Sequence, residues 1–269
     1  MNFLKMEKIY SHFGDSKILF TKKDLTKIGR MKGEVNVVST VCPDYSNNGA
    51  SYTFNGKLGR GVGLVAKRHL EFAPIFLDEL KKVDFDPHYL ILTADLPELV
   101  DCQKGFYLKV ADSKEDYLSR CRSSSEEISK NVSSFGKSKT FSAFYGGQGI
   151  DYLNIQENVA KNIEMRAQKD RDFRGRFNYF MRERKDLAEK FRGRSLSDSE
   201  LEAAAAHGMS LYVTHGTLLK RFFEKENLIV LNHATANLKN FFMCEFVGGY
   251  EYLKDSMNFP IGIIPGDFY

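Results

Sequence analysis

Short apolar runs that end at turn residues recur along this chain, and segments with helical spacing separate them. The first run, residues 34–41, is rich in β-branched side chains and lies between Gly33 and Pro43. An apolar run of this length is typical of a strand buried on both faces, as in a parallel sheet. By this criterion we predict strands at residues 34–41, 88–94, 139–145, 228–231 and 259–264.

Between these runs, apolar residues recur at helical spacing. Residues 62–82 form one such segment, and Pro74 inside it predicts a kink or a break into two helices. Ser197 and Glu200 match a capping box that starts a further helix. The alternation of strands and helices predicts an α/β fold with a mostly parallel sheet and helices on both faces.

No repeat, linker or low-complexity tract divides the 269 residues, so we expect one domain over residues 1–269. A last predicted helix follows Asn232 and carries Glu245 among apolar neighbours. A carboxyl group that faces inward there would have a raised pKa suited to acid–base work, whereas one that faces outward would be an ordinary surface glutamate.

Positive charge is concentrated in one segment, residues 161–194. Twelve Lys and Arg against six Asp and Glu give it +6, while the whole chain is +4, so the remainder is −2. Phe173, Phe177 and Phe180 are spaced to line one face of a helix. One interpretation is a basic surface that binds a nucleic-acid backbone; the other is a solvated helix whose acids pair with its bases. The candidate phosphate contacts are Arg166, Arg171, Arg174, Arg176, Arg182 and Arg184.

Polar residues cluster where the first predicted strand ends. Ser39 and Cys42 are candidate nucleophiles there, although a buried hydroxyl or an inert thiol is the commoner role for each. Asp44 and Tyr45 follow and are candidate substrate contacts. Ligands of open α/β sheets bind beyond the carboxyl ends of the strands, which is where these residues are expected.

Two further features suggest a ligand site at the same edge of the sheet. Gly59 and Gly61 precede a predicted helix and could bring backbone close to an anion, but their spacing matches no dinucleotide or Walker fingerprint. Asp95 ends the second predicted strand, where a carboxylate could bind a ribose hydroxyl or an amine, or simply cap a turn.

The sequence also bears on the cellular compartment of the protein and on whether it binds a metal ion. The four cysteines are scattered, His207, His215 and His233 are well separated among the six histidines, and no zinc spacing occurs, so we expect no metal site. The N-terminal residues lack the apolar core of a signal peptide, and no run is long enough for a membrane span. We therefore expect a cytoplasmic protein with reduced thiols and no membrane partner.

In outline the chain resembles the tRNA-dependent cyclodipeptide synthases. The resemblance rests on Ser39 at the end of the first strand, the arginine-rich segment 161–194, Glu245 on a late apolar helix, and the short run 259–264. It departs from the family at Phe241, where a tyrosine is usual, and at Cys42, where many members carry asparagine.

The resemblance implies a Rossmann-like fold and a transferase that couples aminoacyl groups from tRNA through an acyl-enzyme, with no cofactor. Ser39 or Cys42 would accept the acyl group, Glu245 would shuttle protons, and the arginines would hold RNA. Two other functions stay open. One is a small-molecule transferase that binds S-adenosylmethionine or a nucleotide through Gly59, Gly61 and Asp95; the other is a non-catalytic nucleic-acid-binding protein.

Overall fold

The structure is a computed structural model, and it describes most of the sheet and its helices. The described residues are 20–41, 64–93, 114–175, 195–233 and 259–264, together with 7, 9, 11, 18, 95, 177, 178, 181, 182 and 185.

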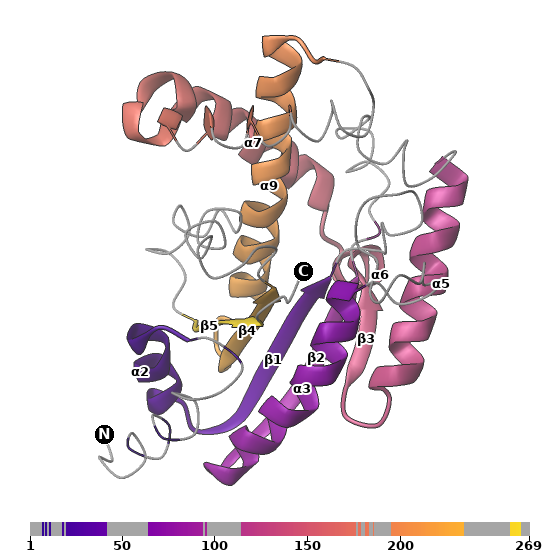
Figure 1. The fold of residues 1–269 in the computed structure, drawn as a ribbon, viewed down its shortest axis with the longest axis vertical. Coiled ribbons are helices and arrows are strands. Elements are labelled where there is room, and N and C mark those ends of the chain that lie inside the picture. Colours follow the sequence, from indigo (N-terminus) through magenta and orange to yellow (C-terminus); the bar gives the residue numbers. More distant parts are fainter. Residues whose placement is uncertain are drawn as a thin grey trace.

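A five-stranded sheet forms the centre of the molecule, and every pair of neighbouring strands in it is parallel (Figure 1). The strand order is β3-β2-β1-β4-β5, which confirms the predicted α/β, Rossmann-like fold. The strands are β1 (Gly33–Val41), β2 (Phe85–Thr93), β3 (Lys137–Thr140), β4 (Leu228–His233) and β5 (Ile261–Ile264).

The central strand β1 sends successive side chains to opposite faces of the sheet. Val37 and Val41 are buried in one apolar cluster and Val38 in the other. Thr40 therefore shares a face with Val38, whereas Ser39 shares the opposite face with Val37 and Val41. This alternation decides what each polar side chain of β1 can reach.

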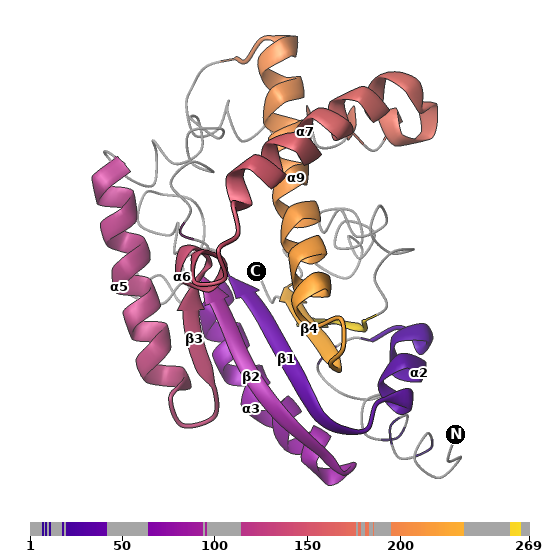
Figure 2. The same ribbon diagram turned by 180° about the vertical axis from the view of Figure 1, so that it is seen from behind.

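Helices cover both faces of the sheet. Figures 1 and 2 view it from opposite sides and show α3 in front of the strands in one and behind them in the other. The first face packs against α2 (Lys22–Arg30), α3 (Leu64–Lys82) and α5 (Lys114–Val132). The second packs against α6 (Phe141–Gly146) and α9 (Asp198–Phe222), and α7 (Tyr152–Lys169) packs on α9.

Two of the predicted helix features can be checked directly. The capping box at the start of α9 is confirmed, because Ser197 accepts from the Glu200 amide and the Glu200 carboxylate accepts from the Ser197 amide. Pro74 lies inside α3, which is one helix from Leu64 to Lys82 rather than two.

The predicted strand at residues 139–145 is wrong beyond Thr140. The Thr140 hydroxyl accepts from the Ala143 amide and caps α6, which begins at Phe141. Phe141, Phe144 and Tyr145 are all buried, and their spacing of three and four residues is helical. The apolar run was read as a strand because its first residues do form one.

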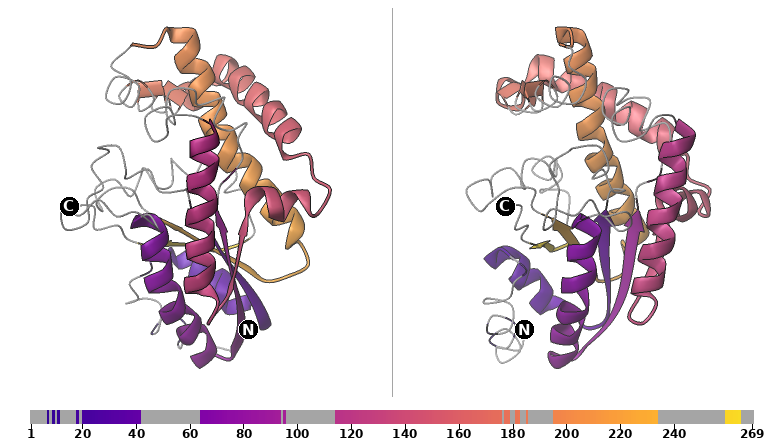
Figure 3. Two further views of the ribbon diagram at one scale, coloured as in Figure 1. Left: turned by 90° about the vertical axis from the view of Figure 1, so that its right-hand side faces the viewer. Right: turned by 45° about the vertical axis from the view of Figure 1, so that its right-hand side comes forward.

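Beyond the carboxyl-terminal edge of the sheet, α7 and α9 form a projecting arm (Figure 3). They pack on each other, and buried Gln156 of α7 donates to Ser210 of α9. Among the helices in the described part of the chain, none has the length and apolarity to cross a bilayer.

Candidate functional site

The order of the strands marks one point of the sheet as the expected ligand site. The connections run outward from β1 to β2 and β3 on one side, and to β4 and β5 on the other. Parallel α/β sheets bind ligands beyond the carboxyl ends of the strands at such a reversal. Here that point lies between the ends of β1 and β4.

A hydrogen-bonded chain of three side chains lies at this point, on the face that carries α9. Thr40, the penultimate residue of β1, places its Oγ1 2.5 Å from Nε2 of His215 on α9. Nδ1 of the same imidazole is hydrogen-bonded to the hydroxyl of Tyr145 on α6. A hydroxyl, an imidazole and a phenol are thus linked in series.

Packing holds the imidazole in this orientation. The ring of Phe141 stacks on His215 at 4.6 Å between centroids and 11° between planes. The Tyr145 ring meets it edge-on at 5.9 Å. Both aromatic residues belong to α6, which begins directly after β3 ends. The position of α6 at the end of β3 therefore determines how the His215 ring is packed.

His215 is neutral in this setting. Its side chain is buried, and burial lowers the pKa of the imidazole to about 3 because the charged form loses its hydration. A neutral imidazole has one N–H donor and one acceptor nitrogen. When Nε2 accepts from the Thr40 hydroxyl, Nδ1–H donates to the Tyr145 oxygen; the other tautomer reverses both hydrogen bonds.

Ser39 lies on the opposite face, in a second buried polar group. Its Oγ accepts from the Tyr89 hydroxyl at 2.8 Å and lies 2.8 Å from Nδ1 of His69 on α3. All three residues are buried, Ser39 completely. Burial raises the pKa of the Tyr89 hydroxyl, so this phenol stays protonated and donates. For Ser39 to attack a substrate, this group would have to open.

Asp95 lies just past β2 and is turned toward α6. One of its carboxylate oxygens accepts from the Ser142 amide at 2.9 Å, and the other accepts from the Ser142 hydroxyl at 2.5 Å. The carboxylate thus holds the first turn of the helix that carries Phe141 and Tyr145. Its predicted contact with substrate stays a prediction.

The arginines of the basic segment fall into two groups. Arg166 pairs with Asp170 at 3.1 Å and lies over Phe173, while Arg174 pairs with Glu202 of α9 at 2.6 Å. The hydrogen bond from the Phe173 amide, followed by that from Arg166, holds the pKa of the Asp170 carboxyl below its usual value. These two arginines therefore contribute to the packing of the arm.

Arg171 and Arg182 are exposed. Phe173 and Phe177 are buried, as their spacing predicted. Exposed cations beside buried aromatic side chains are compatible with a surface that binds nucleic acid and with a solvated helix. The binding of this segment to RNA therefore stays a prediction.

Several predicted site residues have no described position, and their roles stay predictions. Those outside the described residues are Cys42, Asp44, Tyr45, Gly59, Gly61, Arg176, Arg184 and Glu245.

The sequence reasoning missed Thr40, His215 and Tyr145 as a group. Thr40 adjoins Ser39 in the sequence, and strand alternation sends the two hydroxyls to opposite faces. The sequence presents His215 as one of several scattered histidines, and the apolar run around Tyr145 predicts a strand. A polar histidine in an otherwise apolar part of a long helix was the available signal.

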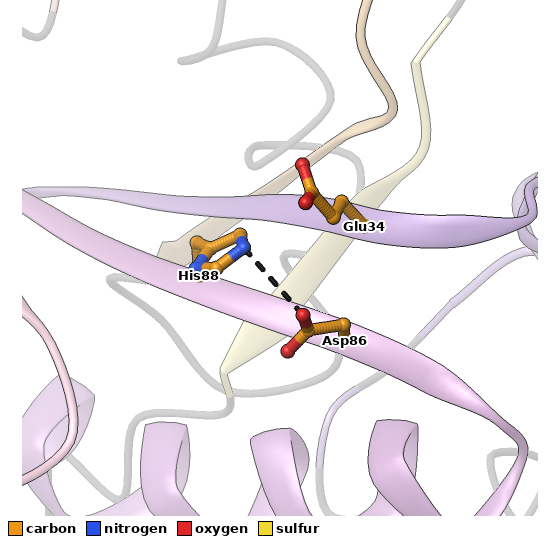
Figure 4. Close-up of side chains that lie close together, drawn as sticks. All are labelled: Glu34, Asp86 and His88. Atoms are coloured by element: carbon orange, nitrogen blue, oxygen red, sulfur yellow. Dashed lines mark ion pairs between the residues drawn. The ribbon is translucent and has the colours of Figure 1, made fainter.

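One cluster of candidate metal ligands lies at the other end of the sheet (Figure 4). Glu34 of β1 and Asp86 and His88 of β2 bring one ligand atom each within 4.8 Å of one another. All three are exposed, at the amino ends of their strands and away from Thr40. Exposed acidic groups commonly lie this close without a metal ion, and nothing else in the described residues indicates one here.

The fold is shared with cyclodipeptide synthases. A CDPS from Staphylococcus haemolyticus matches with a TM-score of 0.50 over 91% of this chain and 96% of its own, at 15% sequence identity. A cyclodipeptide synthase from Bacillus thermoamylovorans gives a TM-score of 0.47 over 91% and 94%, at 14% identity. No protein-family model and no curated protein matches the sequence.

Proposed function

We propose that this chain is an aminoacyl-tRNA-dependent transferase that forms cyclic dipeptides through an acyl-enzyme. The observation that carries the proposal is the hydroxyl–imidazole pair of Thr40 and His215, at the strand reversal of a sheet shared with cyclodipeptide synthases. This pair lies at the carboxyl edge of the sheet, where the substrate of an α/β enzyme binds.

The chemistry proposed needs no cofactor. The ester that joins an amino acid to tRNA is already activated, so its acyl group can pass to an enzyme hydroxyl or thiol without ATP. The amine of a second aminoacyl-tRNA then attacks the acyl-enzyme, and ring closure gives the cyclic dipeptide. The resemblance in sequence offers Ser39 or Cys42 as acceptor and Glu245 as proton shuttle.

In this proposal the arm binds the tRNA. The exposed cations of residues 161–194 supply a sequence-independent attraction to phosphate, and arginine's forked guanidinium suits phosphate geometry. The substrate ester would lie at the ends of β1 and β4, which the arm overhangs (Figure 3). The expected setting is the cytoplasm, where charged tRNA is found.

Mass spectrometry of expression cultures tests the proposal. Cells that express the chain should accumulate neutral compounds with the mass of two amino acids less two waters, and cells with an empty vector should not. His215→Gln should reduce them at least tenfold, whereas the matched loss of an exposed imidazole, His88→Gln, should leave them unchanged. No such compound in any culture, with the protein folded and abundant, would reject the proposal.

A further inference from the structure

The three hydrogen-bonded side chains at the strand reversal run from the core to the rim of the sheet. Tyr145 and His215 are buried, whereas Thr40 is only half-buried and lies one residue before the end of β1. Thr40 Oγ1 contacts Nε2 of His215, and a hydroxyl can donate one hydrogen bond while it accepts another. The outer end of the chain is therefore a hydroxyl at the edge where α/β sheets bind their ligands.

The chemistry of the three groups decides the direction of the hydrogen bonds. Burial lowers the pKa of the His215 imidazole to about 3, so the ring is neutral, and one of its nitrogens donates while the other accepts. A phenol is more acidic than an aliphatic alcohol and is the stronger donor, whereas the alcohol oxygen is the stronger acceptor. The favoured order has the Tyr145 hydroxyl donating to Nδ1 and Nε2–H donating to Thr40 Oγ1.

This order leaves the Thr40 hydrogen pointing away from the imidazole. Because Oγ1 accepts from Nε2–H, its own O–H can donate only to a group other than His215. Hydrogen bonds in series polarise one another, so the last donor of such a chain is stronger than an isolated hydroxyl. An acceptor oxygen bound at the rim would complete the chain.

We infer that Thr40 binds the substrate by donating its hydroxyl hydrogen to an oxygen of the aminoacylated ribose, with His215 and Tyr145 as positioning residues. The inference rests on the proposed function and adds a contact for its substrate. The acyl acceptor stays Ser39 or Cys42. His215 acts here as a neutral donor and takes up no proton, as its burial requires.

The face of the sheet on which Thr40 lies suits the ribose end of the substrate. Ser39 contacts His69 of α3 on one face, whereas Thr40 contacts His215 of α9 on the other. The helix α9 belongs to the arm that is proposed to bind tRNA. A substrate whose acyl group lies toward Ser39 would therefore have its ribose on the side of Thr40.

The tautomer of His215 can be determined in the free protein by nitrogen-15 NMR of the imidazole rings. The signals of His215 are those that His215→Gln removes. At neutral pH the proton is expected on Nε2, with Nδ1 unprotonated and hydrogen-bonded. A proton on Nδ1 instead would turn the Thr40 hydrogen toward Nε2 and overturn the inference.

Steady-state kinetics with aminoacyl-tRNA tests the contact with the substrate. Thr40→Val keeps the shape of the side chain and removes the donor, so KM should rise about tenfold, the upper range for one neutral hydrogen bond, while kcat changes less than about twofold. Thr40→Ser should restore the KM. The matched control is Thr93→Val, which alters a buried threonine at the end of the neighbouring strand and should leave KM unchanged. An unchanged KM in Thr40→Val would overturn the inference.

Tyr145→Phe separates positioning from packing, because it keeps the ring and removes the donor to Nδ1. KM should rise several-fold, and adding Thr40→Val should make it no worse than Thr40→Val alone, since both changes act on the same hydrogen bond. The control is Tyr152→Phe, a buried tyrosine whose ring centroid lies 5.1 Å from that of Tyr145, and it should leave KM unchanged. Increases in KM that multiply in the double variant would overturn the inference.

Failure of the proposed function would give a different result. An unaltered chain that forms no cyclic dipeptide would reject that function and the substrate named here, whatever the tautomer of His215. Normal turnover with an unchanged KM in Thr40→Val would reject only the contact.

Discussion

At the scale of single residues, the two faces of β1 give adjacent hydroxyls different tasks. Ser39 completes a buried polar group with Tyr89 and His69, whereas Thr40 meets His215 near the rim. Buried polar groups are stable only when they are hydrogen-bonded, so the first group contributes to the stability of the sheet. The second lies at the carboxyl edge of the sheet, where α/β folds bind their ligands.

The hydrogen bond from Tyr89 to Ser39 predicts that substitutions of the two residues have coupled effects on stability. Ser39→Ala leaves the Tyr89 hydroxyl buried without this acceptor, which should lower the free energy of unfolding by about 1–3 kcal/mol. Adding Tyr89→Phe removes the stranded donor, so the double variant should lose less than the sum of the two single losses. Urea denaturation measures all three, with exposed Ser134→Ala as control. Strict additivity would show that the pair does not interact.

The buried imidazole predicts how stability depends on pH. Folded His215 takes up its proton only near pH 3, whereas in the unfolded chain it does so near pH 6.5. Between these values the unfolded state binds more protons, so the free energy of unfolding falls as pH falls. From pH 7 to pH 5 this one group should remove about 2 kcal/mol.

Urea titrations of the unaltered chain and of His215→Gln at both pH values isolate that contribution. The variant should lose less stability between pH 7 and pH 5 than the unaltered chain, because glutamine does not titrate. Parallel losses would mean that His215 is not held neutral by burial.

At the scale of elements, α7 and the residues that follow it carry arginines in two settings. Arg166 and Arg174 are paired with acids of the arm, so replacing them would disturb its packing as well as any RNA contact. Arg171 and Arg182 are exposed and are therefore better probes of binding.

Neutralising the exposed pair predicts a change in salt dependence. Arg171→Ala with Arg182→Ala should weaken tRNA binding and reduce the slope of log affinity against log salt by roughly 1 to 2, since each phosphate contact contributes about 0.7 to 0.9. The matched control is Lys23→Ala with Lys32→Ala, which removes equal charge from exposed positions in α2 and just before β1. Equal slopes for both double variants would assign the basic segment to a solvated helix.

The elements also show how far the sequence alone could predict the structure. The β-branched run of β1 and the capping box of α9 are local signals, and both identified their elements. The prediction of a strand over residues 139–145 was wrong because the four residues of β3 pass directly into α6. Hydrophobicity alone does not mark the change from strand to helix. Thr140 acting as a helix cap was the overlooked clue.

The candidate site was harder to predict because it depends on contacts between distant parts of the chain. Thr40 and His215 are 175 residues apart, and Tyr145 is 70 residues from His215. Each taken alone is an unremarkable buried or half-buried residue. Only strand order and alternation bring them together, and neither pairs a particular histidine with a particular hydroxyl.

At the scale of the whole molecule, a parallel sheet has a hydroxyl–imidazole pair at its strand reversal, and the helices α7 and α9 project past the same edge. The similarity to a CDPS over 91% of the chain concerns the fold, and at 15% identity the site has to be argued from this chain's own residues. The expected chemistry follows from where Thr40 and His215 lie relative to that edge.

The most direct measurement follows the ester bond of the substrate itself. Purified protein, without ATP, is added to tRNA charged with labelled amino acids, and acid-precipitable label is followed against uncatalysed hydrolysis. The account predicts that label leaves tRNA faster with the protein present and appears in a neutral cyclic dipeptide. Label that stays on tRNA at the uncatalysed rate, with folded protein in excess, would contradict it.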